Sequence, residues 1–144
     1  MMNGGSTLSG YFSDYNNEAD TIIISEGGNS CGFVNYMTER FWAGGHCYVV
    51  SLLNDDVKGF VYQLLKAYES KIQALRVGSG LPNIQSKDLL NYEVLFCSDH
   101  FEQQKIASCL SEVDGMISAQ VQKVDALKEK KKGLMQQLFP QPLK

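Results

Sequence analysis

The sequence lacks the features that mark membrane proteins and secreted proteins. No stretch stays apolar for the roughly twenty residues that a bilayer-spanning helix needs. The first residues, Met1 to Ser6, contain neither a basic cluster nor an apolar run, so they do not resemble a secretory signal. We therefore expect a cytoplasmic protein.

Residues that carry chemistry are also sparse. The four cysteines form no CxxC pair and the two histidines complete no ligand cluster, so we expect no zinc site. Most of the cysteines lie in or beside apolar runs, which favours buried free thiols. His46 is followed directly by Cys47, but neighbours on a strand point to opposite faces, which argues against a nucleophile pair. Without a Ser-His-Asp arrangement, a phosphate loop or methyltransferase motifs, we predict that the protein is not an enzyme and holds no cofactor itself.

Charge is distributed unevenly along the chain. Residues 1–100 carry six Lys/Arg against eleven Asp/Glu, whereas residues 101–144 carry seven Lys against five Asp/Glu. An acidic globular part argues against a protein that binds nucleic acid by itself through phosphate contacts. It leaves open base reading within a complex in which another subunit supplies the cations.

Apolar patterning in residues 1–100 predicts a small mixed domain of the α+β class. Short β-branched or apolar runs predict strands at residues 21–25, 31–36, 46–53 and 92–96. Apolar residues at helical spacing predict a helix over residues 57–75, capped from within Asn54-Asp55-Asp56. The Gly- and Pro-containing segment 78–84 predicts a loop that ends this helix, and residues 86–90 predict one further turn.

The last third of the chain predicts one long helix over residues 102–138. Asp99 is the expected cap, with Glu102 three residues later as in a capping box. Apolar residues repeat every seven positions in two series offset by three or four, which is the seam of a coiled coil. The series are Leu110, Ile117, Val124, Lys131, Leu138 and Ile106, Val113, Gln120, Leu127, Leu134.

A helix with such a seam cannot bury its apolar stripe by itself, so we expect a partner helix. The residues predicted to pair are Ile106, Leu110, Val113, Ile117, Val124, Leu127, Leu134 and Leu138. Gln120 and Lys131 interrupt the seam, and polar seam residues set register or partner number at a cost in stability. The predicted organisation is a domain at 1–100, a dimerising, coiled-coil-forming helix at 101–139 and a tail at 140–144.

Three segments in a fixed order carry a family resemblance. The helix ending in Ile72-Gln73-Ala74-Leu75 leads to Gly78-Ser79-Gly80-Leu81-Pro82-Asn83-Ile84, and a predicted strand follows at 92–96. The long helix opens with Glu102-Gln103-Gln104-Lys105-Ile106-Ala107 and closes with Gly133-Leu134-Met135-Gln136-Gln137-Leu138-Phe139. Together these segments resemble the specificity (S) subunit of type I restriction–modification enzymes, as one target-recognition domain followed by its spacer helix.

The resemblance implies a DNA reader without catalysis. In S subunits, two recognition domains each read half of a split site in the major groove, and two long helices pair antiparallel as a spacer. Methyltransferase subunits dock on the S subunit, carry S-adenosylmethionine and methylate adenine, and a restriction subunit is an optional partner. Recognition domains of the family tend to be longer than 100 residues, so we expect residues 1–100 to lack the family's N-terminal part and the chain to be a half-subunit or a fragment. A chain with only one half is expected to form a homodimer through residues 102–138. The alternative is an oligomerisation or adaptor module that has lost DNA reading.

Base reading requires polar side chains on loops that reach base edges. Arg76 and Ser79 are favoured because the glycines of the 78–84 loop allow backbone amides to approach a phosphate. The alternative is that Gly78 merely caps the preceding helix. For every candidate, an ordinary solvated loop position is the competing interpretation. The candidates are Arg40, Lys71, Arg76, Ser79, Asn83, Gln85 and Lys87.

Two further groups have a structural and a functional interpretation. Phe41 and Trp42 are interpreted as core anchors, with base stacking as the alternative. Lys128 and residues 130–132 are interpreted as a solvated face that complements the helix C-terminus, with phosphate or partner binding as the alternative. The apolar end at residues 134–139 is expected to pack on a second copy or on a methyltransferase subunit.

Overall fold

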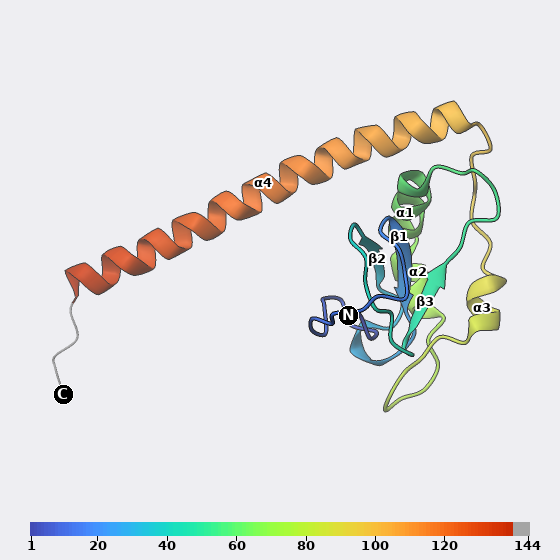
Figure 1. Cartoon of the computed structure of the whole chain (residues 1–144), viewed down its shortest axis with the longest axis horizontal. Coiled ribbons are helices and arrows are strands. Elements are labelled where there is room, and N and C mark those ends of the chain that lie inside the picture. The colour runs from blue at the N-terminus through green and yellow to red at the C-terminus, as the bar shows by residue number, and fades with distance from the viewer. Residues whose placement is uncertain (140–144) are drawn as a thin grey trace. The chain divides into compact units, whose positions relative to one another are not determined.

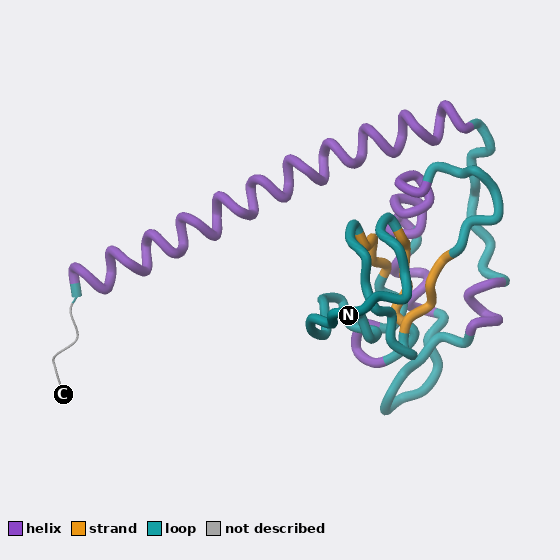
Figure 2. Tube along the Cα trace, in the orientation of Figure 1, coloured by secondary structure: helices purple, strands orange, loops and turns teal. Residues whose placement is uncertain are grey.

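The computed structural model describes residues 1–139, which form two compact units, Met1–Ala107 and the segment from Ser108 onward. Figures 1 and 2 show the order of the elements along the chain. The elements are β1 (Thr21–Ser25), a 3-10 turn (Gly28–Ser30), β2 (Val34–Met37), β3 (Cys47–Val50), α1 (Lys58–Ala67), α2 (Glu69–Ala74), α3 (Ser86–Leu90) and α4 (His100–Leu138). The fold is of the α+β class, as predicted. Residues 140–144, the predicted tail, lie outside the described residues.

A three-stranded antiparallel sheet forms the centre of the first unit, in the order β2-β1-β3. The middle strand β1 is covered on both faces. Ile22 and Ile24 pack in a cluster with residues of α1 and α2, whereas Ile23 packs on the other face with Met2 and Phe41. Burial on both faces explains why three isoleucines follow one another, and it confirms the predicted buried strand.

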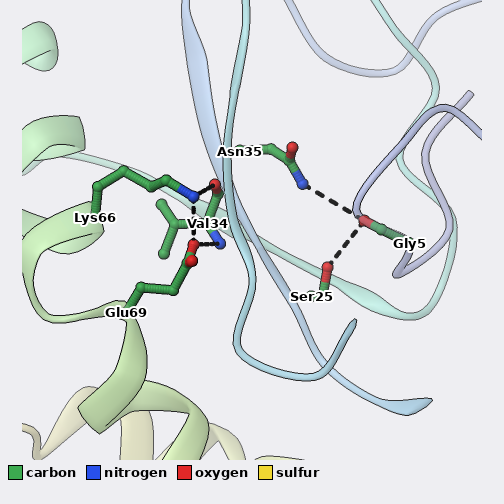
Figure 3. A network of polar contacts seen from close by, with 6 residues as sticks. All are labelled: Gly5, Ser25, Val34, Asn35, Lys66 and Glu69. Carbon is green, nitrogen blue, oxygen red and sulfur yellow. Dashed lines mark hydrogen bonds and ion pairs between the residues drawn. The ribbon is translucent and has the colours of Figure 1, made fainter. Parts of the chain in front are cut away.

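An ion pair closes the outer edge of β2. The Nζ atom of Lys66 lies 2.5 Å from Glu69 Oε2, and both side chains meet the backbone of Val34 (Figure 3). Val34 N–H donates to Glu69 Oε2 at 2.8 Å, and Val34 C=O accepts from Lys66 Nζ at 3.1 Å. The helices thereby satisfy backbone groups that an edge strand would otherwise present to other chains.

The predicted helix over residues 57–75 is confirmed, but as two helices that meet at Tyr68. Its predicted capping is wrong. Val57 occupies the N-cap position of α1 and makes no side-chain cap hydrogen bond. Asp56 instead accepts a hydrogen bond from Gln103 at the start of α4, at 2.8 Å.

The strand predicted at residues 92–96 is wrong. Residues 92–96 have no regular secondary structure and belong to no sheet of residues 1–139. Two aromatic side chains of this segment pack on residues of the helices, with Tyr92 edge-on to Tyr68 at 6.2 Å between ring centroids and Phe96 edge-on to Phe60 at 5.5 Å. The apolar run that predicted a strand thus reflects side chains that pack on the helices rather than strand pairing.

Helix α4 spans 39 residues, about 58 Å at 1.5 Å per residue. The predicted Asp99 cap is confirmed, because Asp99 Oδ1 accepts from Glu102 N–H at 2.7 Å. The first compact unit ends at Ala107 rather than at residue 100, because Gln103 and Ala107 are buried in it. Among residues 1–139, no helix is long and apolar enough to cross a membrane.

Candidate nucleic-acid interface and helix-pairing surface

The Gly-rich loop between α2 and α3 has a fixed stem and an exposed tip. At the stem, Val77 and Asn83 exchange two backbone hydrogen bonds, of 2.8 and 3.0 Å. Ile84 is fully buried and donates its N–H to Glu26 C=O at 2.9 Å, while its own carbonyl accepts from Tyr48 Oη at 2.7 Å. Residues 78–81 project from this stem, seen as the yellow-green loop at the lower edge of the first unit in Figure 1.

Gly78 does not cap α2, so that interpretation is wrong. Helix α2 ends at Ala74, and Leu75, its C-cap residue, has a right-handed helical conformation. Gly78 lies beyond it with a φ of 98°, a left-handed conformation that glycine adopts without strain. This conformation therefore allows the chain to turn within the loop.

Six of the seven candidate base-reading residues lie within residues 71–87, and all seven are exposed. Arg76, Ser79, Asn83, Gln85 and Lys87 follow one another along the Gly-rich loop and the first turn of α3, and Lys71 lies on α2. These six are thus exposed side chains within residues 71–87, a segment that the buried Ile72 and Ile84 anchor to the core. Because the backbone on both sides of the loop is anchored before DNA binds, less conformational entropy is lost on binding.

Arg40 does not belong to this segment. Its Nε lies 2.8 Å from Glu18 Oε2, and its guanidinium stacks 4.8 Å from the centroid of the Tyr15 ring. Both interactions involve the guanidinium group of Arg40, which is the group that would contact a guanine base. Nearby, the predicted core roles are confirmed for Phe41, which is buried, while Trp42 is half-buried and packs edge-on against Phe12 at 5.1 Å.

A groove beside the loop contains residues that the sequence did not single out. It is lined by Asn3, the turn at residues 26–28, His46 and residues 81–83. His46 Nδ1 lies 3.7 Å from Glu26 Oε2, and Leu81 at the loop tip is 82% exposed. These residues come from four separate parts of the chain, so no local spacing could have grouped them.

Gln103 has a structural role that its sequence pattern did not indicate. Its side chain is only 1% exposed and makes three hydrogen bonds within the first unit. Its Oε1 accepts from Val57 N–H at 2.9 Å, and its Nε2 donates to Asp56 Oδ1 at 2.8 Å and to Cys97 C=O at 2.9 Å. Gln103 therefore ties the start of α4 to the start of α1 and to the preceding hinge. One turn later, a Cβ at Gly59 would lie 3.4 Å from that of Ala107, so a small residue allows the two helices to approach closely.

The apolar seam of α4 is exposed over most of its length. In the second unit, Ile117 is 57% exposed and Leu138 71%. Additional apolar side chains at Met116, Val121 and Met135 widen the stripe, and a shallow hollow runs along residues 113–128. The remaining seam residues predicted to pair are also exposed, namely Leu110, Val113, Val124, Leu127 and Leu134.

Ile106 differs from the other seam residues, because it is half-buried against the core of the first unit. The exposed seam therefore starts at Leu110. Beside the seam, Lys128 pairs with Asp125 at 2.9 Å, and Lys132 lies 4.0 Å from Glu129. These exposed pairs along one helix are typical of a solvated face.

The cysteines differ in exposure and in pKa. Cys31 is buried, Cys47 and Cys97 are half-buried and Cys109 is exposed, so the prediction that most of the cysteines are buried is confirmed only for Cys31. Burial raises the pKa of the Cys31 thiol. The hydrogen bond from Cys97 Sγ to Glu102 Oε2, 3.2 Å long, raises the pKa of that thiol.

Comparisons with known proteins agree with the resemblance seen in the sequence. Residues 2–129 match the family model described as the type I restriction modification DNA specificity domain. A Mycoplasma genitalium protein named as a type I specificity subunit is 36% identical over 115 residues, which cover 78% of this chain and 30% of that protein. The MjaVIII specificity subunit of Methanocaldococcus jannaschii is 30% identical over 80 residues, which cover 56% of this chain and 19% of that subunit.

The fold agrees as well. The crystal structure of a type I restriction–modification S subunit from M. genitalium matches with a TM-score of 0.82 and 30% identity, covering 96% of this chain and 37% of that one. The chain belongs to the type I restriction modification DNA specificity domain family. It spans about a third of the length of these M. genitalium relatives.

Proposed function

We propose that this chain acts as a DNA-sequence-specificity subunit, or as half of one, in a type I restriction–modification complex. The observation that carries the proposal is the family match over residues 2–129, which includes both the globular unit and most of the helix. In this proposal the chain itself catalyses no reaction. It reads one half of a split DNA site and scaffolds other subunits in the cytoplasm.

The exposed segment at residues 71–87 supports the reading role. Arg76 and Lys87 offer the donors that guanine accepts, and Asn83 and Gln85 offer the paired donor and acceptor that suit adenine. A Cβ at Gly80 would meet no atom within 4 Å, so the backbone there leaves space for a phosphate to approach. Arg40 would read DNA only after leaving Glu18 and Tyr15, so we rank it last.

Affinity must come largely from other subunits. Residues 1–100 have an excess of acidic residues, and specific binding draws much of its strength from phosphate neutralisation. Methyltransferase subunits that dock on this chain would supply those cations, and they would also carry the S-adenosylmethionine. A restriction subunit is a further partner of such a complex.

The exposed seam of α4 supports pairing with a second copy. Two copies would give two reading domains, as a split target requires. An aspartate in place of Ile117, in the middle of the seam, would place a charge in the contact. We expect Ile117→Asp to convert a dimer to a monomer in light scattering, whereas Ser118→Asp, one position away on the exposed side, leaves the mass unchanged.

A methylation assay tests the whole proposal. The chain is combined with methyltransferase subunits and S-adenosylmethionine, and methylated adenines are mapped on genomic DNA. We expect one split sequence to be methylated only when the chain is present, and Arg76→Ala to weaken methylation of that sequence. Methylation that proceeds equally well without the chain would contradict the proposal.

The acidic first unit also favours a second candidate, an adaptor that assembles subunits without reading DNA. In that case the complex and the methyltransferase alone would bind duplex DNA with the same salt dependence and the same sequence preference. A steeper salt dependence alone would show added phosphate contacts, whereas a new sequence preference would show reading.

A further inference from the structure

The two polar residues of the exposed seam are separated by eleven positions, and this spacing has a consequence for pairing. Gln120 and Lys131 belong to different heptad series and are both exposed on α4 of the single chain. In a parallel pair, each seam residue faces its own equivalent. Lys131 would then face Lys131 of the second copy, and two like charges would meet within the seam.

Charge along the helix also disfavours a parallel pair. Residues 108–122 contain two acidic and no basic residues, whereas residues 123–138 contain five lysines against two acidic residues. Parallel pairing would align the two basic halves with each other. Antiparallel pairing places the basic half of each helix along the acidic half of the other, which is complementary.

In an antiparallel pair, a residue of one series faces a residue of the other series, and permitted registers differ by seven residues. One register places Lys131 opposite Gln120 of the second copy, twice by symmetry. The other facing pairs are then all apolar, namely Ile117 with Leu134, Val124 with Leu127, and Val113 with Leu138. A shift of one heptad places Gln120 opposite Val124 or Leu138 and leaves a polar group without a partner in the seam.

The antiparallel orientation is the one that the family resemblance implies. Within it, we propose that α4 pairs with a second copy of this chain in the register that places Lys131 opposite Gln120. The inference rests on the proposed function for its second copy, and it adds the register. The ammonium of Lys131 would donate to the side-chain oxygen of Gln120 while its methylene stem covers apolar neighbours. The two polar residues thereby set the register that the apolar residues alone leave free.

Register has a direct consequence for DNA spacing. A slide of one heptad moves one helix along the other by about 10 Å, given a rise of 1.5 Å per residue. At about 3.4 Å per base pair, such a slide corresponds to about three base pairs between half-sites. A fixed register therefore fixes the spacer length that the complex accepts.

The substitution Gln120→Glu tests the register by the sign of its effect. In the proposed register, the introduced carboxylate faces Lys131 of the second copy in both symmetric layers, so the dimer should tighten by about tenfold. In a parallel pair the two carboxylates would face each other, and in any other antiparallel register each would face an apolar residue, so the dimer would weaken. Gln122→Glu is the matched control, because it makes the same change outside the seam and should leave the dissociation constant unchanged.

Dissociation constants are measured by sedimentation equilibrium, with circular dichroism to confirm that helix content is retained. Weakening by Gln120→Glu, or a monomeric parent chain, would overturn the register. Charge exchange provides a second variant: Gln120→Lys should weaken the dimer, and Lys131→Glu in the same chain should restore it. A failure of restoration would also overturn the proposal.

Crosslinking provides an independent measurement. A Gln120→Cys chain mixed with a Lys131→Cys chain should form mixed disulfide dimers well above the level of the parent chain, whereas a Gln120→Cys chain alone should not crosslink through that position. Self-crosslinking at position 120 would show parallel pairing and overturn the proposal. If the helices do not pair in this register but methylation remains sequence-specific, only this inference is refuted. If the helices pair in this register but methylation is not sequence-specific, only the proposed function is refuted.

Discussion

The substitution Gln103→Ala should strongly destabilise the first unit, although Gln103 is a polar residue on a long, mostly exposed helix. Its side chain is 1% exposed and its three hydrogen bonds measure 2.8 to 2.9 Å. Truncation leaves Val57 N–H and Cys97 C=O without this partner, at about 1 kcal/mol each, and removes a bond to the Asp56 carboxylate of about 1.5–2 kcal/mol. The expected loss is therefore about 3–4 kcal/mol, a large part of the stability of a typical domain.

Urea unfolding followed by tryptophan fluorescence measures this loss, because Trp42 is the single tryptophan and lies in the first unit. With a urea dependence of about 1–1.5 kcal/mol per molar, the midpoint should fall by roughly 2–4 M. Gln122→Ala is the matched control, since it truncates the same side chain at an exposed position of the same helix. It should change stability by no more than about 0.5 kcal/mol. Equal midpoints for the two variants would refute the reasoning.

A carboxylate at the same position adds a pH dependence. Gln103→Glu would place a second carboxylate beside Asp56, which raises the pKa of the introduced group in the folded state. A group with a raised folded pKa favours the folded state only while it is protonated. The variant should therefore be least stable near neutral pH and recover part of its loss as the pH falls below about 5. A variant whose deficit relative to the parent is constant between pH 4 and 8 would contradict the assigned contact.

The remaining predictions concern the sheet edge, the loop and the thiols. Glu69→Ala removes the acceptor of Val34 N–H and half of the ion pair, so the urea midpoint should fall by the equivalent of about 2 kcal/mol; an unchanged midpoint would contradict the edge-closing role. Gly78→Ala should cost about 1 kcal/mol because of its φ of 98°, while Gly80→Ala, where a Cβ has open space, should be nearly neutral. Cys109, being exposed, should react with a thiol reagent at pH 8 well before Cys31, whose burial raises its pKa; mass spectrometry of the labelled peptides would reveal the reverse order.

Local patterns predicted much of the secondary structure. Side chains on the buried face of a helix or strand recur with the period of that element, so apolar residues recur in the sequence with the same period. This relation accounts for the β-branched run at β1, the helical spacing over residues 57–75 and the seven-residue repeat in α4. The strand predicted at residues 92–96 failed for the same reason. The apolar run indicated that side chains such as Tyr92 pack on the domain, but it could not indicate whether the backbone finds a strand partner.

The candidate DNA-reading residues were predictable only where they are local. Arg76, Ser79 and Asn83 share one loop, so their spacing in the sequence placed them together. His46 and Glu26 join the same surface through the tertiary fold, and Arg40, chosen by the same chemistry, is engaged by Glu18. Burial decided the role of Gln103 as well, since a glutamine on a helix is usually solvated and only the packed neighbours of this one show otherwise.

The sequence by itself determined that this chain has a long helix with an exposed seam, because a periodic apolar stripe follows from helix geometry alone. It also determined the family, through the segments at both ends of that helix. Only the tertiary structure decided where the first unit ends, which seam residue packs on the core of that unit and which loop residues are exposed. Those outcomes depend on contacts between residues far apart in the chain, and no local pattern encodes such contacts.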